Sequence, residues 1–173
     1  MVCKSFAALE PRPSPSFFRC ILLSPNEPLP RFVWAEYSSA SDYTTMKCKT
    51  FTGNHLLGHI DSEVAVSGCN VGDWPLKQPD SHRLGIYYQD AYLVDDSPIT
   101  PSITKWVGRE AGHYFRGTFL AHGWKPEEIE GDDVFEFGRP CDLDTADLCY
   151  LLDYFLVQGE QHRKAYGDFK EFK

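Results

Sequence analysis

Apolar residues are most regularly spaced near the C-terminal end of the chain, between Asp142 and Gly159. From Leu148 to Val157 every residue except Asp153 is apolar or aromatic. At 3.6 residues per turn this leaves no wide polar face, so the pattern predicts a helix that is covered on more than one side. Asp142 or Asp144 can cap its N-terminus. Gly159 predicts its C-terminal end, because glycine adopts the left-handed conformation without a Cβ clash. Asp153 either has a polar partner in the interior or marks the one wet edge of the helix.

Upstream of this helix, apolar residues form short runs or alternate with polar ones, which is typical of strands. The predicted strands are Phe17–Leu23, Arg31–Tyr37, a weaker Lys47–Phe51, His82–Val94 as one bent strand or two, and Gly112–Trp124. Pro101–Trp106 predicts a helical turn, and Asn54–Ile60 fits either a helical turn or a strand. Strands followed by one solid helix predict an α+β fold, with a single antiparallel sheet packed against the C-terminal helix.

The length of 173 residues predicts a single domain spanning 1–173. Within it, residues 1–16 predict an extended proline-rich arm, because Pro11, Pro13 and Pro15 exclude a helix. Residues 160–173 predict a charged tail after the helix.

The net charge is −8, and nine carboxylates lie between Glu127 and Asp147 against the single cation Arg139. This acidic balance argues against nucleic-acid binding, which depends on neutralising phosphates. It also argues against docking on anionic lipid.

The N-terminus lacks the continuous apolar stretch of a signal peptide, and no apolar run approaches the ~18 residues of a membrane span. The six cysteines are scattered without a C-x-x-C pair. They predict reduced thiols, mostly in the core, of a cytoplasmic protein.

Three groups of short motifs carry a resemblance to a known family. They are Val2-Cys3-Lys4-Ser5-Phe6, then Cys20–Leu23 with Pro30–Trp34, and then Tyr88–Asp95 with Gly112-His113 and Leu152–Leu156. Together they resemble the region that follows the zinc finger in fungal MYND-finger proteins of largely unknown function. The resemblance implies that Cys3 corresponds to the last zinc-binding cysteine of the finger. The other finger ligands are absent, and a structural zinc needs about four. The chain also departs from the pattern in having Gln89 in place of arginine and Phe115 in place of tryptophan.

His113, Arg116 and His122 are the candidate catalytic residues of the last predicted strand. Strand alternation places His113 and Arg116 on opposite faces, and a bulge at Gly117 would change the face of His122. Histidine suits general acid/base catalysis, and arginine suits binding of an oxyanion or carboxylate. In the alternative interpretation, a histidine bonds a backbone carbonyl and the arginine pairs with the acidic 127–147 segment.

Aromatic residues gather around the same predicted strands and predict the lining of a small-molecule pocket. The group comprises Tyr87, Tyr88, Tyr92, Trp106, Tyr114, Phe115 and Trp124, of which Tyr88, Tyr92, Trp106, Phe115 and Trp124 are the candidate substrate-binding residues. Asp90 follows Tyr88 by two positions on the same strand face and is a candidate base, or a group that orients a histidine. The alternative is an ordinary core that is rich in aromatic residues.

No metal and no cofactor is predicted. His55 and His59 have the i, i+4 spacing of metal-binding helices, but Gly58 interrupts the turn and no third ligand is evident beyond Asp61 or Glu63. Cys69 would be a nucleophile only if a histidine lowered its pKa. The sequence contains no P-loop, dinucleotide-binding glycine motif, nucleophile elbow or H-E-x-x-H motif, which disfavours the corresponding reactions.

Two hypotheses follow. The first is a small-molecule-binding protein for an apolar metabolite, as a cofactor-free isomerase, cyclase or lyase of fungal specialised metabolism by analogy. The second is a finger-less protein-interaction module that uses its acidic surface or its proline-rich arm. The first predicts a pocket of several hundred Å³ beside the aromatic residues, whereas the second predicts a filled core with a flat apolar patch. Homo-oligomerisation is left open.

Overall fold

The computed structural model describes residues 10–36, 66–70, 82–89, 97–125 and 139–166. The elements are β1 (Phe17–Leu23), β2 (Arg31–Glu36), β3 (Val66–Asn70), β4 (Arg83–Gln89), α2 (Pro101–Val107), α3 (Arg109–Gly112), β5 (Phe119–Lys125), β6 (Arg139–Cys141) and α4 (Thr145–Tyr166). The predicted elements at 47–51 and 54–60 and the end of His82–Val94 lie outside the described residues.

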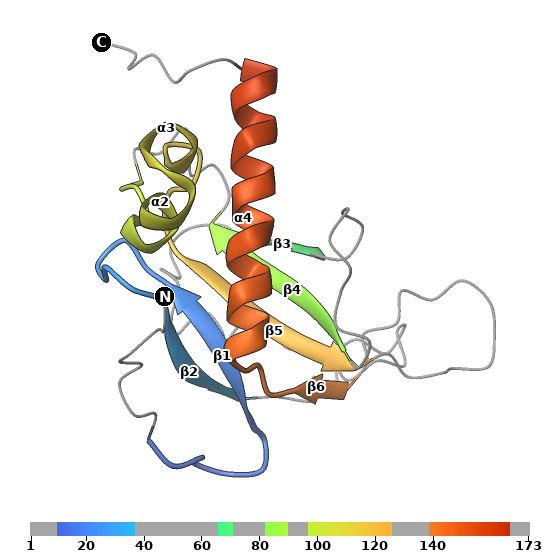
Figure 1. The fold of residues 1–173 in the computed structure, drawn as a ribbon. Helices are drawn as coiled ribbons and strands as arrows, with labels where there is room; N and C mark the ends of the chain where they lie inside the picture. The colour runs from blue at the N-terminus through green and yellow to red at the C-terminus, as the bar shows by residue number, and fades with distance from the viewer. Residues whose placement is uncertain (1–9, 37–65, 71–81, 90–96, 126–138, 167–173) are drawn as a thin grey trace, which may run out of the picture.

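The described strands form a six-stranded sheet in the order β2-β1-β5-β4-β3, with β6 beside the end of β5. Every pairing is antiparallel. Helix α4 crosses one face of this sheet, and α2 and α3 lie against its C-terminal half (Figure 1). The predicted α+β architecture, an antiparallel sheet packed against the C-terminal helix, is therefore confirmed.

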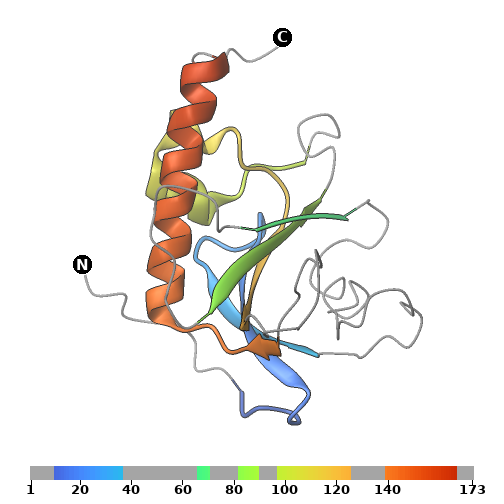
Figure 2. The ribbon, with the colours of Figure 1, turned by 90° about the vertical axis from the view of Figure 1, so that its right-hand side faces the viewer.

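The two faces of the sheet are filled by alternating side chains of the same strands, as the pleat requires. The helix face, which packs against α4, contains Ile21, Leu23, Leu84, Ile86, Phe119 and Ala121. The far face contains Cys20, Leu22, Val33, Ala35 and Leu120. Figure 2 shows that α4 lies on one side of the sheet. Register keeps the helix face continuous, because Ala121 of β5 lies between Ile21 of β1 and Ile86 of β4.

The N-terminus of α4 is held by two carboxylates. Asp144 Oδ1 accepts hydrogen bonds from the backbone N–H groups of Ala146 and Asp147, so Asp144 is the cap. Asp147 Oδ2 accepts the N–H of Asp144 in return, at 2.8 Å. This is a reciprocal capping arrangement. Asp147 Oδ1 also accepts a 2.6 Å hydrogen bond from His82 Nε2, which ties α4 to the start of β4.

The predicted end of this helix at Gly159 is wrong, because α4 continues to Tyr166. Gly159 is buried in the helix, and a Cβ built on it would lie 2.8 Å from the Cβ of Ala111 and 3.3 Å from a ring carbon of Phe115. Glycine is needed here for close approach to α3, not for a left-handed turn. Residues 160–166, which the sequence predicts as a charged tail, belong to the helix and include a Glu160–Arg163 ion pair.

Asp153 is exposed and its neighbour Leu156 is 40% exposed. The interpretation of Asp153 as a marker of the wet edge of the helix is thus confirmed.

The prediction of one strand over Gly112–Trp124 is correct only for its second half. Gly112 ends α3 and packs so closely on Thr104 that a Cβ would lie 2.5 Å from its hydroxyl oxygen. Gly117 has φ 77°, which interrupts an extended strand. Around Gly117 the chain is hydrogen-bonded to the segment before α2. Thr100 N–H donates to the carbonyl of Phe115, and Gly117 N–H donates to the carbonyl of Pro98. Strand β5 begins only at Phe119.

Residues 10–16 of the predicted arm contain neither helix nor strand. They lie against β2, since Trp34 Nε1 donates to the carbonyl of Glu10 and the Arg12 guanidinium lies over the Trp34 ring. Arg12 also pairs with Asp142. Strand β3, strand β6 and helix α3 were not expected from the sequence. No helix in the described part of the chain has the length and apolarity that a membrane crossing requires.

Candidate functional site

A pocket of about 230 Å³ opens between the helix face of the sheet and the second half of α4. It is lined by Ile86 and Tyr88 of β4, Phe115 of the loop after α3, Phe119 of β5, and Tyr154, Phe155, Gln158 and His162 of α4. This volume is below the roughly 300–1,000 Å³ that is typical of small-molecule sites, and it is smaller than the several hundred Å³ that the first hypothesis predicts.

Three phenylalanines form the rigid base of this pocket. Phe155 meets Phe115 and Phe119 edge to face, with ring centroids 5.0 and 5.4 Å apart. Phe115 and Phe119 are also edge to face, at 6.3 Å. All three are buried. This mutual T-shaped packing is a favoured aromatic geometry, so the base is held in one arrangement.

The partly buried lining residues carry the polar atoms of the pocket. They are Tyr88, Tyr154, Gln158 and His162. Tyr88 stacks on Phe119 at 6.3 Å, and Tyr154 packs edge to face on Phe155 at 5.7 Å. An apolar base with a few polar groups around it is the common composition of a small-molecule site.

His162 is the histidine of this lining. Its ring stacks on Tyr114 at 5.2 Å and on Tyr166 at 6.0 Å, and it meets Phe115 edge to face at 6.3 Å. Burial lowers the pKa of His162 because the imidazolium loses water among these rings. The imidazole is therefore neutral at neutral pH, with one nitrogen that donates and one that accepts a hydrogen bond.

Two of the predicted substrate-binding residues, Tyr88 and Phe115, line the pocket. Trp106 does not, because it is 49% exposed on α2. Trp124 is not in the lining either, since strand alternation places it with His122 on the far face. Tyr92 and Asp90 lie outside the described residues.

His122 is buried on the far face, on the opposite side of the sheet from the pocket. It alternates with Phe119 and Ala121 and stacks on Tyr87 at 4.8 Å. Gly85 lies opposite it on β4, and a Cβ there would come within 2.5 Å of its Nε2. Burial lowers the pKa of His122 to about 4. The structure does not bring this predicted acid/base to the pocket.

His113 and Arg116 hold the loop after α3. Arg116 Nε donates to the carbonyl of His113 at 3.2 Å, and its Nη1 donates to the carbonyl of Ser97 at 3.2 Å. Neither residue is in the pocket lining. The arginine thus joins two backbone segments and does not form the predicted anion clamp in this pocket.

Tyr154, Gln158 and His162 were missed by the sequence analysis. Their spacing of i, i+4 and i+8 places them on one face of a helix. This signal becomes visible only when the helix is continued past Gly159, as the helix-favouring residues Glu160–Ala165 allow. The prediction that the helix ends at Gly159 concealed this shared face.

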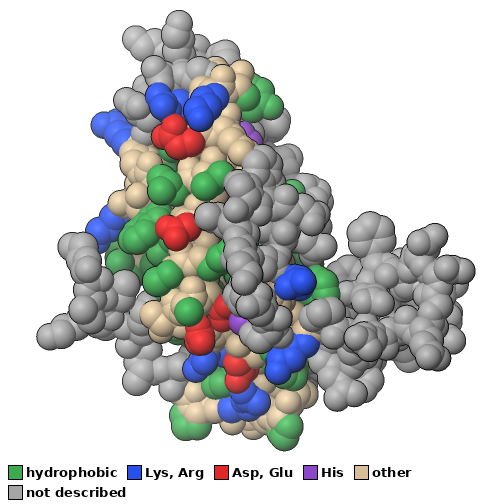
Figure 3. All heavy atoms as spheres, turned by 45° about the vertical axis from the view of Figure 1, so that its right-hand side comes forward, with side chains coloured by type: hydrophobic (Ala, Val, Ile, Leu, Met, Phe, Trp, Pro, Cys, Tyr) green, Lys and Arg blue, Asp and Glu red, His purple; other side chains and the backbone are tan. Residues whose placement is uncertain are grey.

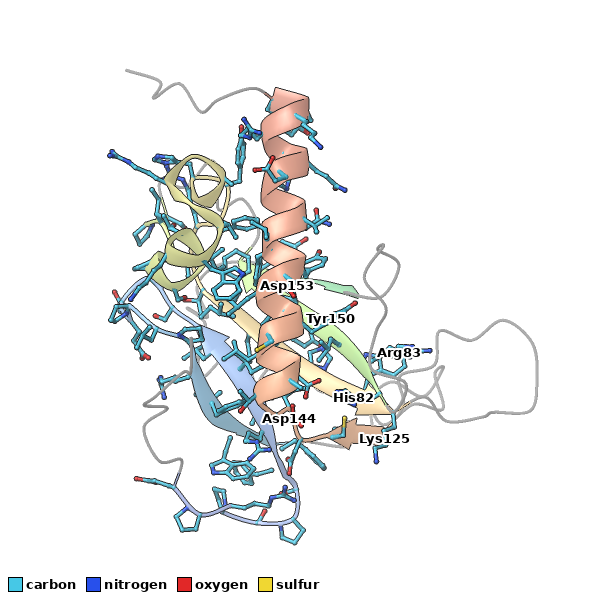
Figure 4. All side chains as sticks on the ribbon, viewed as in Figure 1. His82, Arg83, Lys125, Asp144, Tyr150 and Asp153 are labelled. Atoms are coloured by element: carbon cyan, nitrogen blue, oxygen red, sulfur yellow. The ribbon has the colours of Figure 1, made fainter. Side chains whose placement is uncertain are left out.

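A second polar group lies at the start of α4. The His82–Asp147 bond is largely buried, with 14% and 2% of the two side chains exposed. Figure 4 shows His82, Arg83 and Tyr150 on the β4 side of α4. Burial raises the pKa of Tyr150, and the positive charge of Arg83 opposes this shift. On this side of the molecule, acidic and basic side chains of the described residues are mixed with apolar ones (Figure 3).

Among the described residues, no group of three histidine, cysteine, aspartate or glutamate side chains is arranged to hold a metal ion. His55 and His59 lie outside this part of the chain. Burial raises the pKa of the Cys141 thiol to about 11 and that of the Cys20 thiol still further. Both are therefore poor nucleophiles. The side chain of Cys69 is not described.

Comparison with known proteins adds no relative: no family model, no curated protein and no solved structure matches the chain.

Proposed function

We propose that this protein binds a small, largely apolar molecule in the pocket between α4 and the helix face of the sheet. The observation that carries the proposal is the pocket of about 230 Å³, with three interlocked phenylalanines at its base and Gln158 and His162 among its lining. A cavity of roughly 150 Å³ in another protein is large enough for benzene. The pocket therefore suits a ligand of one or two rings.

The same site supports a cofactor-free isomerase, cyclase or lyase as the enzymatic form of this proposal. Such reactions need a positioned proton shuttle in a site that limits water. In this pocket the shuttle would be His162, which replaces His113 and His122 in that role. The hydroxyls of Tyr88 and Tyr154 are the accompanying donors of the lining.

The cytoplasmic setting and the link to fungal specialised metabolism remain part of the proposal. Cys20, Cys141 and Cys149 are free thiols in the described part of the chain, which suits a reducing compartment. The fungal setting rests on the resemblance to MYND-finger proteins alone.

The test is a titration of the full chain with naphthalene, followed by NMR or calorimetry. We expect saturable binding at one site. Gln158→Trp should abolish it, because an indole on the partly buried Gln158 position would fill the pocket from its edge without changing the phenylalanine base. Leu156→Trp, two positions away on the exposed side of α4, is the matched control and should bind as the wild type does. Saturable binding that survives Gln158→Trp would refute the assignment of this pocket.

A further inference from the structure

The pocket has an aromatic interior. Phe115, Phe119 and Phe155 contact one another edge to face, and Tyr88 is stacked on Phe119 at an interplanar angle of 29°. A planar ring can extend these contacts by stacking or by presenting its edge, which is how aromatic groups pack best. A bulky, non-planar aliphatic ligand would make fewer favourable contacts with the same aromatic rings.

Among the described residues, the lining contains no lysine, arginine, aspartate or glutamate. A charged ligand would therefore lose hydration without meeting a countercharge in the described lining, and that loss is expensive in an apolar site. The expected ligand is uncharged.

His162 supplies a hydrogen-bond acceptor in this apolar surrounding. Stacking on Tyr114 occupies a face of the imidazole, so its nitrogens, which lie in the ring plane, stay at the edge. A neutral imidazole has one nitrogen with a free lone pair. Burial holds His162 in the neutral state by lowering its pKa. The tyrosine hydroxyls and the Gln158 amide donate as readily as they accept, so His162 is the strongest base among the described lining residues.

From these features we infer that the ligand is an uncharged, planar aromatic or enolic molecule of one or two rings, whose hydroxyl donates a hydrogen bond to His162. This inference rests on the binding function proposed above and narrows it to one chemical class. Phenols and stabilised enols belong to this class, whereas carboxylates and amines charged at neutral pH do not.

Three probes of equal ring size test the inference on the full chain by calorimetry at neutral pH. They are 2-naphthol, its methyl ether 2-methoxynaphthalene, which has lost the donor, and 2-naphthoate, which carries a negative charge. We expect 2-naphthol to bind about tenfold more tightly than the ether, the effect of one hydrogen bond in a partly buried site. We expect 2-naphthoate to bind at least about tenfold more weakly than 2-naphthol.

Variants identify the acceptor. His162→Phe should abolish the preference for 2-naphthol over the ether while leaving affinity for the ether close to that of the wild type. His162→Gln, which keeps an acceptor, should retain part of the preference. Gln161→Met, beside His162 on α4 but outside the pocket lining, is the matched control and should retain all of it. Far-ultraviolet circular dichroism checks that each variant is folded.

The possible outcomes test the inferred ligand class separately from the proposed binding function. Equal affinity of the wild type for 2-naphthol and the ether, or a preference that survives His162→Phe, overturns the inference but leaves the binding function standing. Tight binding of 2-naphthoate overturns the uncharged class. Failure of all three probes to bind the wild type defeats the binding function itself, and the inference with it.

Discussion

A histidine lies on each side of the sheet, His122 buried and His162 partly buried, and the difference between them shows what makes a histidine a candidate site. On the far face, His122 stacks on Tyr87 and fills the space above Gly85, where no Cβ would fit. On the helix face, His162 also lies among aromatic rings, but it borders a pocket. Burial lowers the pKa of both. A lowered pKa alone therefore does not mark function, because it reports burial, whereas a site also needs room for a ligand.

The largest expected effect comes from detaching α4, which would destroy the helix face and its pocket. Asp147→Ala leaves the imidazole of His82 and the backbone N–H of Asp144 without their buried acceptor. We expect it to lower the free energy of unfolding by about 3 kcal/mol or more, as measured by urea denaturation. Asp153→Ala, on the exposed edge of the same helix, is the control and should change it by less than about 0.5 kcal/mol. Equal effects of the two substitutions would show that the His82–Asp147 bond does not anchor α4.

The second-largest effect comes from the far face and is a loss of folding stability as the pH is lowered. The pKa of His122 is lowered from 6.5 in the unfolded chain to about 4 in the folded protein. As pH falls from 6.5 toward 4, the unfolded state takes up a proton that the folded state does not, so stability falls. The loss from this residue should approach about 3 kcal/mol near pH 4. Urea denaturation at a series of pH values measures it.

His122→Gln should remove most of this dependence of the free energy of unfolding on pH. His162→Gln should remove only a smaller part of it, because His162 is less buried. If the pH dependence of the free energy of unfolding persists in His122→Gln and disappears in His162→Gln, then His162, and not His122, is the histidine whose burial costs stability in acid.

The third effect tests the close contact that positions Phe115 at the pocket. Gly159→Ala should lower the free energy of unfolding by about 1–2 kcal/mol, because crowding against Ala111 outweighs the gain in helix propensity. The double variant Gly159→Ala with Ala111→Gly moves the methyl group from one helix to the other and should recover most of this loss. A stabilised single variant would mean that α3 and α4 can move apart without cost.

The smallest effect concerns a residue that the sequence assigned to the site. Trp106 is 49% exposed on α2 and does not line the pocket. Trp106→Ala should change the free energy of unfolding by no more than about 0.5 kcal/mol and leave the affinity for 2-naphthol unchanged. A loss of affinity above about threefold would place this indole nearer the ligand than the structure does.

The local patterns predicted part of the candidate site. Tyr88 was identified because it belongs to the predicted strand His82–Val94, and Phe115 because it belongs to the aromatic group around the predicted strands. His113 and Arg116 were misplaced because Gly117, with its positive φ, turns the expected strand into a loop. His162 was overlooked because Gly159 has two roles that look alike in the sequence: ending a helix, or allowing a second helix to come close.

The sequence by itself determined the fold class of this protein and the main elements of its core. Periods of two and 3.6 are local properties of the chain, so the strands around Ile21 and Ile86 and the helix around Leu151 were predictable from them. The tertiary structure alone decided which histidine meets the pocket. That choice depends on the register of β5 between β1 and β4 and on where α4 crosses them, and both bring together residues far apart in the chain. The physical reason is that packing of Gly159 on Ala111 and of His82 on Asp147 selects one docking of α4 among many that the same apolar pattern would allow.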